Sequence, residues 1–416
     1  MIKFLKIIFH KKRRLLAKFW LIFNKQLTVI GVVGSYGKTN TTRAIMSVLS
    51  QKYKSLQTDL NLDTIYNLPI TILKARPSHK KLILEYGVDH KGEMDSHLSL
   101  VKPKIGVLTG INPTHADPDL LGSLKGIIQE KSKLVKNLPK DGLLVANWDD
   151  KNVRQMIKLS RARVWRYSLE DPEAEFYAKD IKVDISGTTF KAFIKEKEKN
   201  KGFIVKTGLI GEHFVQCCLA ALALGFYEGL NQEQIKRGLE KLKPLPGRLS
   251  MEKGPFDSVL LNDSLRANPA STLAGLKVLS TLETKGKRIA VLGEMGELGI
   301  FAQKEHQKIG EAVSNLKIDY LISVGPLQKL TAQSAIKSGM KKNSVFYVKD
   351  IIQAANILKK ILKKDDLFYL KGSLLKHLER IVLLLKNEKV DCKIPSCRFY
   401  RHCRDCLYLH KKTSGL

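Results

Sequence analysis

The chain has 416 residues, of which 44% are hydrophobic, so it is long enough for two or three packed domains and too long for one ordinary core. Lys and Arg number 72 against 40 Asp and Glu, which gives a formal net charge of +32. This charge favours nucleic acid, an anionic membrane or an acidic substrate as partner, but it is spread along the whole chain and is equally typical of a lysine-rich proteome. No uninterrupted apolar run approaches the roughly 20 residues that span a bilayer, and no cleavable signal pattern is present, so we expect no transmembrane helix and a reducing, cytoplasmic setting.

Residues 1–26 contain eight Lys or Arg and no acidic residue. At about 100° per residue this segment separates into a basic stripe and an apolar stripe, the latter holding Leu5, Ile8, Phe9, Leu16, Phe19, Trp20 and Phe23. Such a basic amphipathic helix lies in the interface of an anionic membrane, or else packs its apolar face on the protein itself. The sequence leaves both readings open.

From Leu27 onward, short apolar runs alternate with helical patterns. The first runs are Val29–Gly34, Leu82–Gly87 and Ile105–Gly110. Strands that are hydrophobic on both faces and alternate with helices predict a mainly parallel sheet covered on both sides, an α/β fold. A hairpin with its turn at Gly187 is expected within Glu175–Lys197, followed by helices at about 212–227 and 232–242.

Two prolines and a glycine in Lys243–Gly247 predict a linker. Beyond it, strands are expected at Ser258–Leu261, Arg288–Gly293, Tyr320–Val324, Val345–Val348 and Leu367–Leu370, alternating with helices in a second, Rossmann-like α/β sheet. We therefore expect four parts: a basic helix (1–26), a central ATP-binding domain (27–245), a C-terminal Rossmann-like domain (246–388) and a Cys-rich basic tail (389–416).

The stretch from Val32 to Thr39, VVGSYGKT, follows a predicted strand (Thr28–Val33) and precedes a predicted helix. Glycines let backbone amides approach phosphate oxygens, the lysine reaches the outer phosphates, and the threonine can bind Mg²⁺. A phosphate-binding loop is therefore predicted, although the usual pattern has glycine at Val32. The loop residues expected to contact ATP are Gly34, Ser35, Gly37, Lys38, Thr39 and Asn40.

This compact loop, with glycines three residues apart, resembles that of the Mur ligases, a family that shares its ATPase core with folylpolyglutamate synthase and cyanophycin synthetase. Tyr36 stands where that family more often has a small or polar residue, and its ring is expected at the mouth of the phosphate site. Further segments resemble the family's motifs in the same order: Leu84–Gly87, Ile111–His115, Glu130–Lys133 and Asp141–Asp150.

The resemblance implies catalytic roles for Lys38, Glu85, His115 and Lys131. Mg²⁺ would be held by Thr39, Glu85, His115 and a carbamylated Lys131, and Asn147 would contact the nucleotide. The alternative for Lys131 is a solvated helix lysine. The family's glutamate two residues later is Lys133 here.

Later segments extend the resemblance. Gly211-Glu212-His213 is similar to a nucleotide-binding segment, with Phe214 and Cys217 replacing its asparagines, and Pro246-Gly247-Arg248 is similar to a motif at the domain junction whose arginine helps hold the nucleotide. Three segments resemble the branch of the family that adds D-alanyl-D-alanine: Asn262–Ser271, Val291–Gly299 and Leu370–Ser373. The resemblance implies ATP contacts at His213, Arg248, Asp263 and Asn268 and substrate contacts at Lys371 and Ser373. Departures at Asn262, Leu265 and Arg266 leave the substrate open.

The implied activity is ATP-dependent amide synthesis through an acyl phosphate on a cell-wall precursor, with D-alanyl-D-alanine or another amine as the second substrate. Only the basic helix precedes the first strand, so the family's UDP-binding domain is expected to be missing, and the helix is expected to bring the enzyme to a membrane. The alternative is an altered ATPase that serves as a membrane-associated or nucleic-acid-binding scaffold; no nucleic acid is expected with the ligase.

The tail places Cys392, Cys397, Cys403 and Cys406 within fifteen residues, beside His402 and His410. Four soft ligands so close together predict a tetrahedral Zn²⁺ site, with an iron–sulfur cluster, reactive thiols and disulfides as alternatives. Cys217 and Cys218 are expected to be small core residues of a helix.

Overall fold

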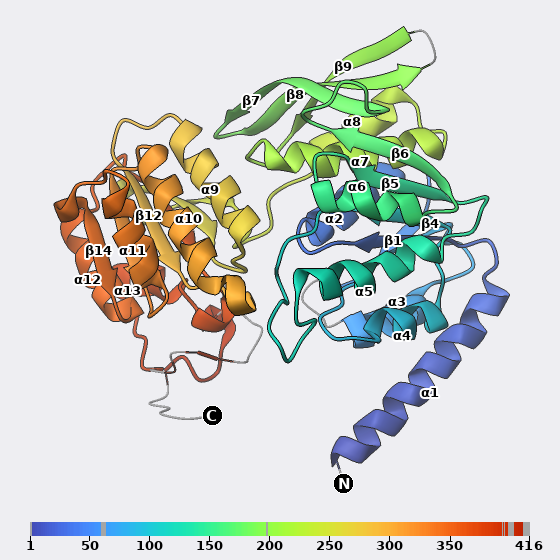
Figure 1. Ribbon diagram of the computed structural model, residues 1–416, viewed down its shortest axis with the longest axis horizontal. Coiled ribbons are helices and arrows are strands. Elements are labelled where there is room, and N and C mark those ends of the chain that lie inside the picture. Colours follow the sequence, from blue (N-terminus) through green and yellow to red (C-terminus); the bar gives the residue numbers. More distant parts are fainter. Residues whose placement is uncertain are drawn as a thin grey trace. The chain divides into compact units, whose positions relative to one another are not determined.

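The computed structural model describes residues 2–59, 64–196, 199–392, 394, 396–397 and 403–410. The predicted hairpin end at Lys197 and the tail residue His402 lie outside the described residues. The chain forms two compact units, one of residues 1–182 and 187–243 and the other of residues 183–186 and 244–416 (Figure 1). The division at residues 243 and 244 falls within the segment predicted as a linker.

The first unit is built on a nine-stranded sheet in the order β2-β3-β1-β4-β5-β6-β7-β8-β9. The pairs from β2 to β7 in this order are parallel, and β8 and β9 are antiparallel. The strands are β1 (Thr28–Val33), β2 (Ser55–Gln57), β3 (Lys81–Glu85), β4 (Ile105–Leu108), β5 (Leu143–Asn147), β6 (Arg163–Ser168), β7 (Phe176–Asp184), β8 (Gly187–Glu196) and β9 (Lys199–Thr207).

The register of the central strands brings the candidate site residues to one edge of the sheet. Val32 of β1 pairs with Glu85 at the end of β3, and Val33 pairs with Leu108 at the end of β4. Because parallel strands end on the same side, the loops after β1, β3 and β4 meet there. The predicted strand Thr28–Val33 is confirmed, and its five C-terminal residues are buried, as expected for a strand covered on both faces.

Helices cover both faces of this sheet (Figure 1). One group, α2 (Lys38–Leu49), α7 (His213–Tyr227) and α8 (Gln232–Glu240), packs together closely. Glycines permit the approach, since a Cβ on Gly225 would lie 2.7 Å from Val48 Cγ1 and one on Gly238 would lie 2.6 Å from Val48 Cα. The other group is α3 (Thr64–Lys74), α4 (Glu93–Leu100), α5 (Leu124–Lys136) and α6 (Lys151–Met156).

The N-terminal helix α1 (Ile2–Phe23) runs along the outside of this unit beside α3 (Figure 1). Its inner side carries Ala17, which is fully buried, and two side chains that donate to backbone carbonyls: Arg14 Nη2 to Ser96 at 2.6 Å and Trp20 Nε1 to Ala75 at 2.8 Å. Four residues of the apolar stripe are exposed, so the alternative in which the stripe packs on the protein is wrong for Phe9, Leu16, Phe19 and Phe23. No described helix is both long and apolar enough to cross a membrane.

The second unit has a six-stranded sheet in the order β10-β11-β15-β12-β13-β14, parallel except for the edge pair β10 and β11. The strands are β10 (Ser250–Lys253), β11 (Val259–Asp263), β12 (Arg288–Gly293), β13 (Tyr320–Val324), β14 (Val345–Val348) and β15 (Leu367–Lys371). The helices are α9 (Pro269–Thr281), α10 (Ala302–Asn315), α11 (Gln328–Lys337), α12 (Ile351–Ile361) and α13 (Arg380–Leu385). Two mainly parallel α/β sheets confirm the predicted fold class.

Candidate active site

The loop after β1 has the geometry of a phosphate-binding loop. Gly37 has φ 79°, a left-handed conformation that favours glycine, and it caps the N-terminus of α2. A Cβ on Gly34 would lie 2.0 Å from Thr109 Oγ1, so the loop rests directly on the segment after β4. Ser35 N donates to the Gly110 carbonyl at 2.7 Å, and Thr109 Oγ1 donates to the Tyr36 carbonyl at 2.6 Å. This fixed backbone at a helix N-terminus suits an anion.

Two polar side chains at the start of α2 contact the loop and the end of β3. Lys38 Nζ donates to the Gly34 carbonyl at 2.9 Å, which places the ammonium over the loop. Thr39 Oγ1 donates to Glu85 Oε2 at 3.1 Å, so the hydroxyl of the loop and the carboxylate at the end of β3 are neighbours. Hydroxyl and carboxylate oxygens are the ligands that Mg²⁺ prefers, and this pair fits such an ion.

The ring of Tyr36, predicted at the mouth of the phosphate site, is held by the segments that follow β4 and β5. It packs on Gly110, where a Cβ would lie 2.2 Å from the ring, and its hydroxyl donates to Asp150 Oδ2 at 3.2 Å. Burial and the nearby Asp150 raise the pKa of Tyr36 above its usual value. Asp150 also caps α6 by accepting from the amides of Asn152 and Val153. Tyr36 therefore ties the loop to α6.

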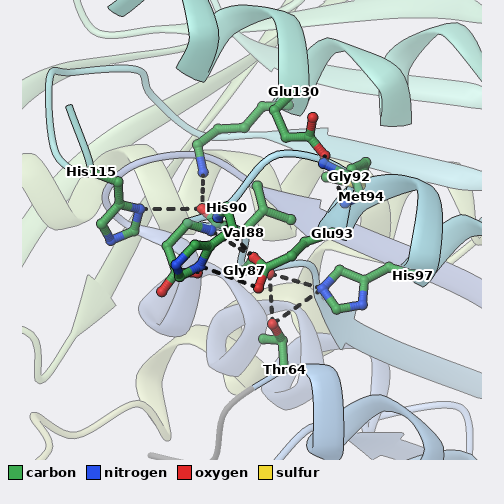
Figure 2. A network of polar contacts seen from close by, with 12 residues as sticks. Thr64, Gly87, Val88, His90, Gly92, Glu93, Met94, His97, His115 and Glu130 are labelled. Atoms are coloured by element: carbon green, nitrogen blue, oxygen red, sulfur yellow. Dashed lines mark hydrogen bonds and ion pairs between the residues drawn. The ribbon is translucent and has the colours of Figure 1, made fainter. Parts of the chain in front are cut away.

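Lys131 of α5 is fully buried, which contradicts the alternative of a solvated helix lysine. Burial and, to a lesser degree, the charge of Lys38 lower its pKa to about 7. Its Nζ donates to the Val88 carbonyl at 3.2 Å, and His115 Nδ1 lies 3.2 Å from the same oxygen (Figure 2). A buried lysine that is half neutral near pH 7 has the amine needed to react with CO₂, so the residues present fit a carbamylated lysine.

Glu130, which precedes Lys131, holds the neighbouring helix in place. Its Oε1 accepts from the amides of Gly92 and Met94 at 3.0 and 2.9 Å, at the start of α4 (Figure 2). Its Oε2 accepts from Lys133 Nζ at 2.7 Å, so Lys133 acts at the surface as a partner of Glu130 and Asp95. With this departure from the family at Lys133, Lys131 is still fully buried.

Sequence reasoning missed three residues beside this site: Asp89, His90 and Glu93. Their ligand atoms lie within 4.8 Å of one another, and Glu93 Oε2 accepts from the amides of Asp89 and His90. The sequence signal for this cluster would have been its position: two carboxylates and an imidazole follow a strand that ends in a candidate Mg²⁺ ligand. Asp89 also interacts electrostatically with His115, which places the cluster next to the candidate metal ligands.

The remaining ATP candidates of the first unit lie at the end of β5 and the start of α7. Asn147 is buried and its Oδ1 accepts from the amide of Asp149, so its side chain shapes the loop after β5. His213 opens α7 with its ring centroid 4.0 Å from that of Phe214. Asn40 lies in the first turn of α2, half-buried.

In the second unit Asp263, at the end of β11, and Lys371, at the end of β15, form a buried ion pair of 2.6 Å. Tyr369 donates to the same carboxylate at 3.0 Å. Burial lowers the pKa of Lys371 and raises that of Asp263, with the pair opposing both shifts. Lys371 was predicted to contact substrate, yet its ammonium is also held by the Arg266 carbonyl at 2.8 Å.

Three further candidates lie near this pair in the sequence. The side chain of Asn268 caps α9, with Oδ1 accepting from the amide of Ser271, which gives it a structural role. Ser373 precedes a short 3-10 helix after β15. The backbone amide of Arg248 donates to the Leu245 carbonyl.

The four tail cysteines do not form the predicted cluster. No disulfide joins the described cysteines. Among described residues, the metal-ligand group in this region is instead His377, Glu379 and Cys403. The tail folds back on the second unit, where the Cys397 amide donates to the Leu375 carbonyl at 2.8 Å.

Comparison with known families gives two matches that together span most of the chain. Residues 32–225 match the Mur ligase middle domain, and residues 247–374 match the Mur ligase, glutamate ligase domain.

Among curated proteins, the UDP-N-acetylmuramoyl-tripeptide–D-alanyl-D-alanine ligase of Bacillus subtilis is 33% identical over 356 residues, 85% of this chain and 75% of the relative. The protein of the same name from Escherichia coli is 31% identical over 307 residues, 74% of this chain and 66% of the relative. The match thus spans about two thirds of the length of the Escherichia coli relative.

Solved structures share the fold. The chain superposes on MurF from Acinetobacter baumannii with a TM-score of 0.80 at 24% identity, covering 91% of this chain and 81% of that one. The MurF ligase from Thermotoga maritima, solved in complex with ADP, gives 0.78 at 22% identity, covering 91% and 84%.

Proposed function

The chain belongs to the Mur ligase family, and we propose that it joins a carboxylate of a peptidoglycan precursor to the amine of D-alanyl-D-alanine. ATP is converted to ADP and phosphate in the reaction: the carboxylate takes the γ-phosphoryl group to form an acyl phosphate, and the amine then displaces phosphate to form the amide. One observation carries the proposal. Lys38, Thr39, Glu85, His115 and Lys131 converge where β1, β3 and β4 end.

The loop residues bind and orient the phosphates. The rigid backbone from Gly34 to Gly37 offers amides to phosphate oxygens, and Lys38 neutralises charge on the phosphoryl group in flight. When bound to the Thr39 and Glu85 oxygens, Mg²⁺ supplies further positive charge at the phosphates. These residues thus favour a transition state whose charge lies on the transferred group.

Lys131 and His115 would help to stabilise the same charge. A neutral Lys131 amine reacts with CO₂ to give a carbamate, an anionic oxygen ligand formed with loss of one proton. This group and the His115 imidazole would provide a second place for a divalent cation. Because Val88 offers one carbonyl to both side chains, the backbone after β3 fixes their spacing.

We further infer that α1 attaches the enzyme to an anionic membrane surface. The outer side of the helix exposes Phe9, Leu15, Leu16, Phe19, Ile22 and Phe23, with Phe19 at 58% and Phe23 at 64% exposure. Exposed lysines accompany them at positions 11, 12, 18 and 25. Such a helix suits an anionic surface, because its apolar groups insert at the level of the headgroups. Each lysine near the surface adds about 1 kcal/mol of binding free energy.

The test of the ligase proposal is product formation. The purified chain is incubated with ATP, Mg²⁺, a UDP-N-acetylmuramoyl-tripeptide and D-alanyl-D-alanine, and the coupled product is measured by mass spectrometry. Glu85→Gln should lower the rate by at least about 100-fold, because a metal ligand at the phosphates is removed. Lys125→Ala, an exposed lysine on α5, is the control and should retain the wild-type rate. Absence of product from the wild-type chain would refute the proposal.

A further inference from the structure

The C-terminal tail is anchored on the second unit beside the loop that follows β15. Inside the tail, the amides of Asp391 and Cys392 donate to the Leu409 carbonyl at 3.0 and 3.1 Å. Cys403 and Leu409 pack with Leu383 of α13 in a small apolar cluster. The tail is therefore folded, and it brings a thiol against residues that precede α13.

Three potential metal ligands meet at this contact. A ring nitrogen of His377, a carboxylate oxygen of Glu379 and Cys403 Sγ lie within 4.8 Å of one another. His377 is 2% exposed, Cys403 is 4% exposed, and the Glu379 side chain is largely buried. His377 Nδ1 lies 2.9 Å from Glu379 Oε1, and the same oxygen accepts from the Cys403 amide at 3.2 Å. The cluster is thus held by a backbone amide of the tail in addition to the contacts between its side chains.

Polar atoms in the cluster lack partners although they are buried. His377 Nε2 and Glu379 Oε2 have no hydrogen-bond partner in the described structure. Each such atom costs about 1–3 kcal/mol if it stays unsatisfied. A cation bound to either atom would satisfy it. The two atoms are therefore an observation, independent of the ligand distances, that indicates a bound ion.

Arg380 places a positive charge beside Cys403, which suits a thiolate held by a metal. Arg380 Nε donates to Cys403 Sγ at 2.9 Å, and Arg380 also interacts electrostatically with Cys392. Binding of a metal would release the thiol proton to solvent and leave the thiolate bonded to the ion and to Arg380.

We propose that His377, Glu379 and Cys403 bind one Zn²⁺ ion that fastens the C-terminal tail to the second unit. A nitrogen, an oxygen and a sulfur ligand are a set that zinc accepts, and tetrahedral geometry needs ligand separations of about 3.3–3.8 Å. The observed spacing requires only small side-chain movements. Among the described residues Cys392, Cys397 and Cys406 all lie outside this group, so water takes the fourth position.

The site has a structural consequence for the ligase domain. Only Gly372 to Lys376 separate Lys371, at the end of β15, from His377. Lys376 in this loop pairs with Glu294 at 2.9 Å. An ion at His377 would therefore fix one end of the loop that carries Ser373. This role is independent of which substrates the enzyme joins.

The experiment measures zinc bound to the full chain after reconstitution and gel filtration, by elemental mass spectrometry. We expect about one ion per chain in the wild type and in Cys397→Ser, and below about a tenth of that in His377→Ala and Cys403→Ser. Circular dichroism confirms that each variant is folded. Glu379→Gln, a conservative change, should weaken zinc affinity at least about tenfold.

Cobalt(II) provides a second readout that does not depend on activity. Added to the metal-free wild type and to Cys397→Ser, it should give a thiolate-to-cobalt charge-transfer band, which should be missing from Cys403→Ser. Wild-type protein without stoichiometric zinc would overturn the proposal. Loss of zinc from Cys397→Ser to the extent seen with Cys403→Ser would also overturn it, because the ion would then belong to a set of cysteines.

Discussion

The buried amine of Lys131 leads to a prediction about carbamylation. With a pKa of about 7 instead of 10.5, about half of the amine is neutral at pH 7 rather than about one part in 3,000, an increase of about 10³-fold in the form that reacts with CO₂. The wild-type chain in ¹³C-bicarbonate at pH 7.5 should therefore show a carbamate carbon signal by NMR. Lys131→Met should lack this signal, and Lys125→Met, at an exposed position of the same helix, should keep it.

The same lowered pKa predicts how stability depends on pH in CO₂-free buffer. Between pH 7 and 10.5 the unfolded chain holds a proton on this lysine that the folded chain has lost, so the free energy of unfolding rises with pH across this window. A lowering of the pKa from 10.5 to about 7 corresponds to a rise of about 5 kcal/mol in the free energy of unfolding across this window. Urea unfolding at several pH values should show this rise in Lys125→Met and a flatter profile in Lys131→Met.

Two results would refute the reasoning about Lys131. A carbamate signal that persists in Lys131→Met would assign the modification to another amine. Equal pH profiles of unfolding for Lys131→Met and Lys125→Met would mean that the ammonium is not penalised by burial. Either outcome would remove the second cation site from the proposed mechanism.

Other parts of the structure make two more predictions. Tyr36→Phe should lower the free energy of unfolding, measured with urea, by about 1 kcal/mol, because the hydrogen bond to Asp150 is lost. The kcat of this variant should be unchanged. A tenfold fall in kcat would instead place the hydroxyl at the phosphates. Replacing Phe19 and Phe23 together by serine should weaken sedimentation with anionic liposomes at least about tenfold, since two large apolar groups no longer insert. Ile300→Ser, exposed in the second unit, is the matched control, and equal binding by both proteins would contradict membrane attachment through α1.

Much of the fold followed from hydrophobic patterning. The run Thr28–Val33 is apolar on both faces and ends at a glycine, and it forms β1 with the predicted bounds. By contrast β9 (Lys199–Thr207) escaped prediction, because its start is rich in Lys, Asn and Gly, and its pairing with β8 supplies the strand conformation.

The candidate site was predictable where motif residues sit at strand ends and less so where distant segments decide the orientation of side chains. Tyr36 reaches Asp150 because Gly110, far along the chain, leaves room for its ring. His377 carries no sequence signal for a metal, because its partner Cys403 arrives through the fold of the tail. The amphipathic pattern of α1 was visible, but the carbonyls of Ala75 and Ser96 decide which side docks.

The most direct test of the ligase account is ADP release by the purified chain, measured with and without each second substrate. The account predicts rapid release only when UDP-N-acetylmuramoyl-tripeptide and D-alanyl-D-alanine are both present, with one ADP formed for each amide bond. ATP hydrolysis at a rate that is indifferent to both substrates would contradict it and would favour an ATPase that serves as a scaffold.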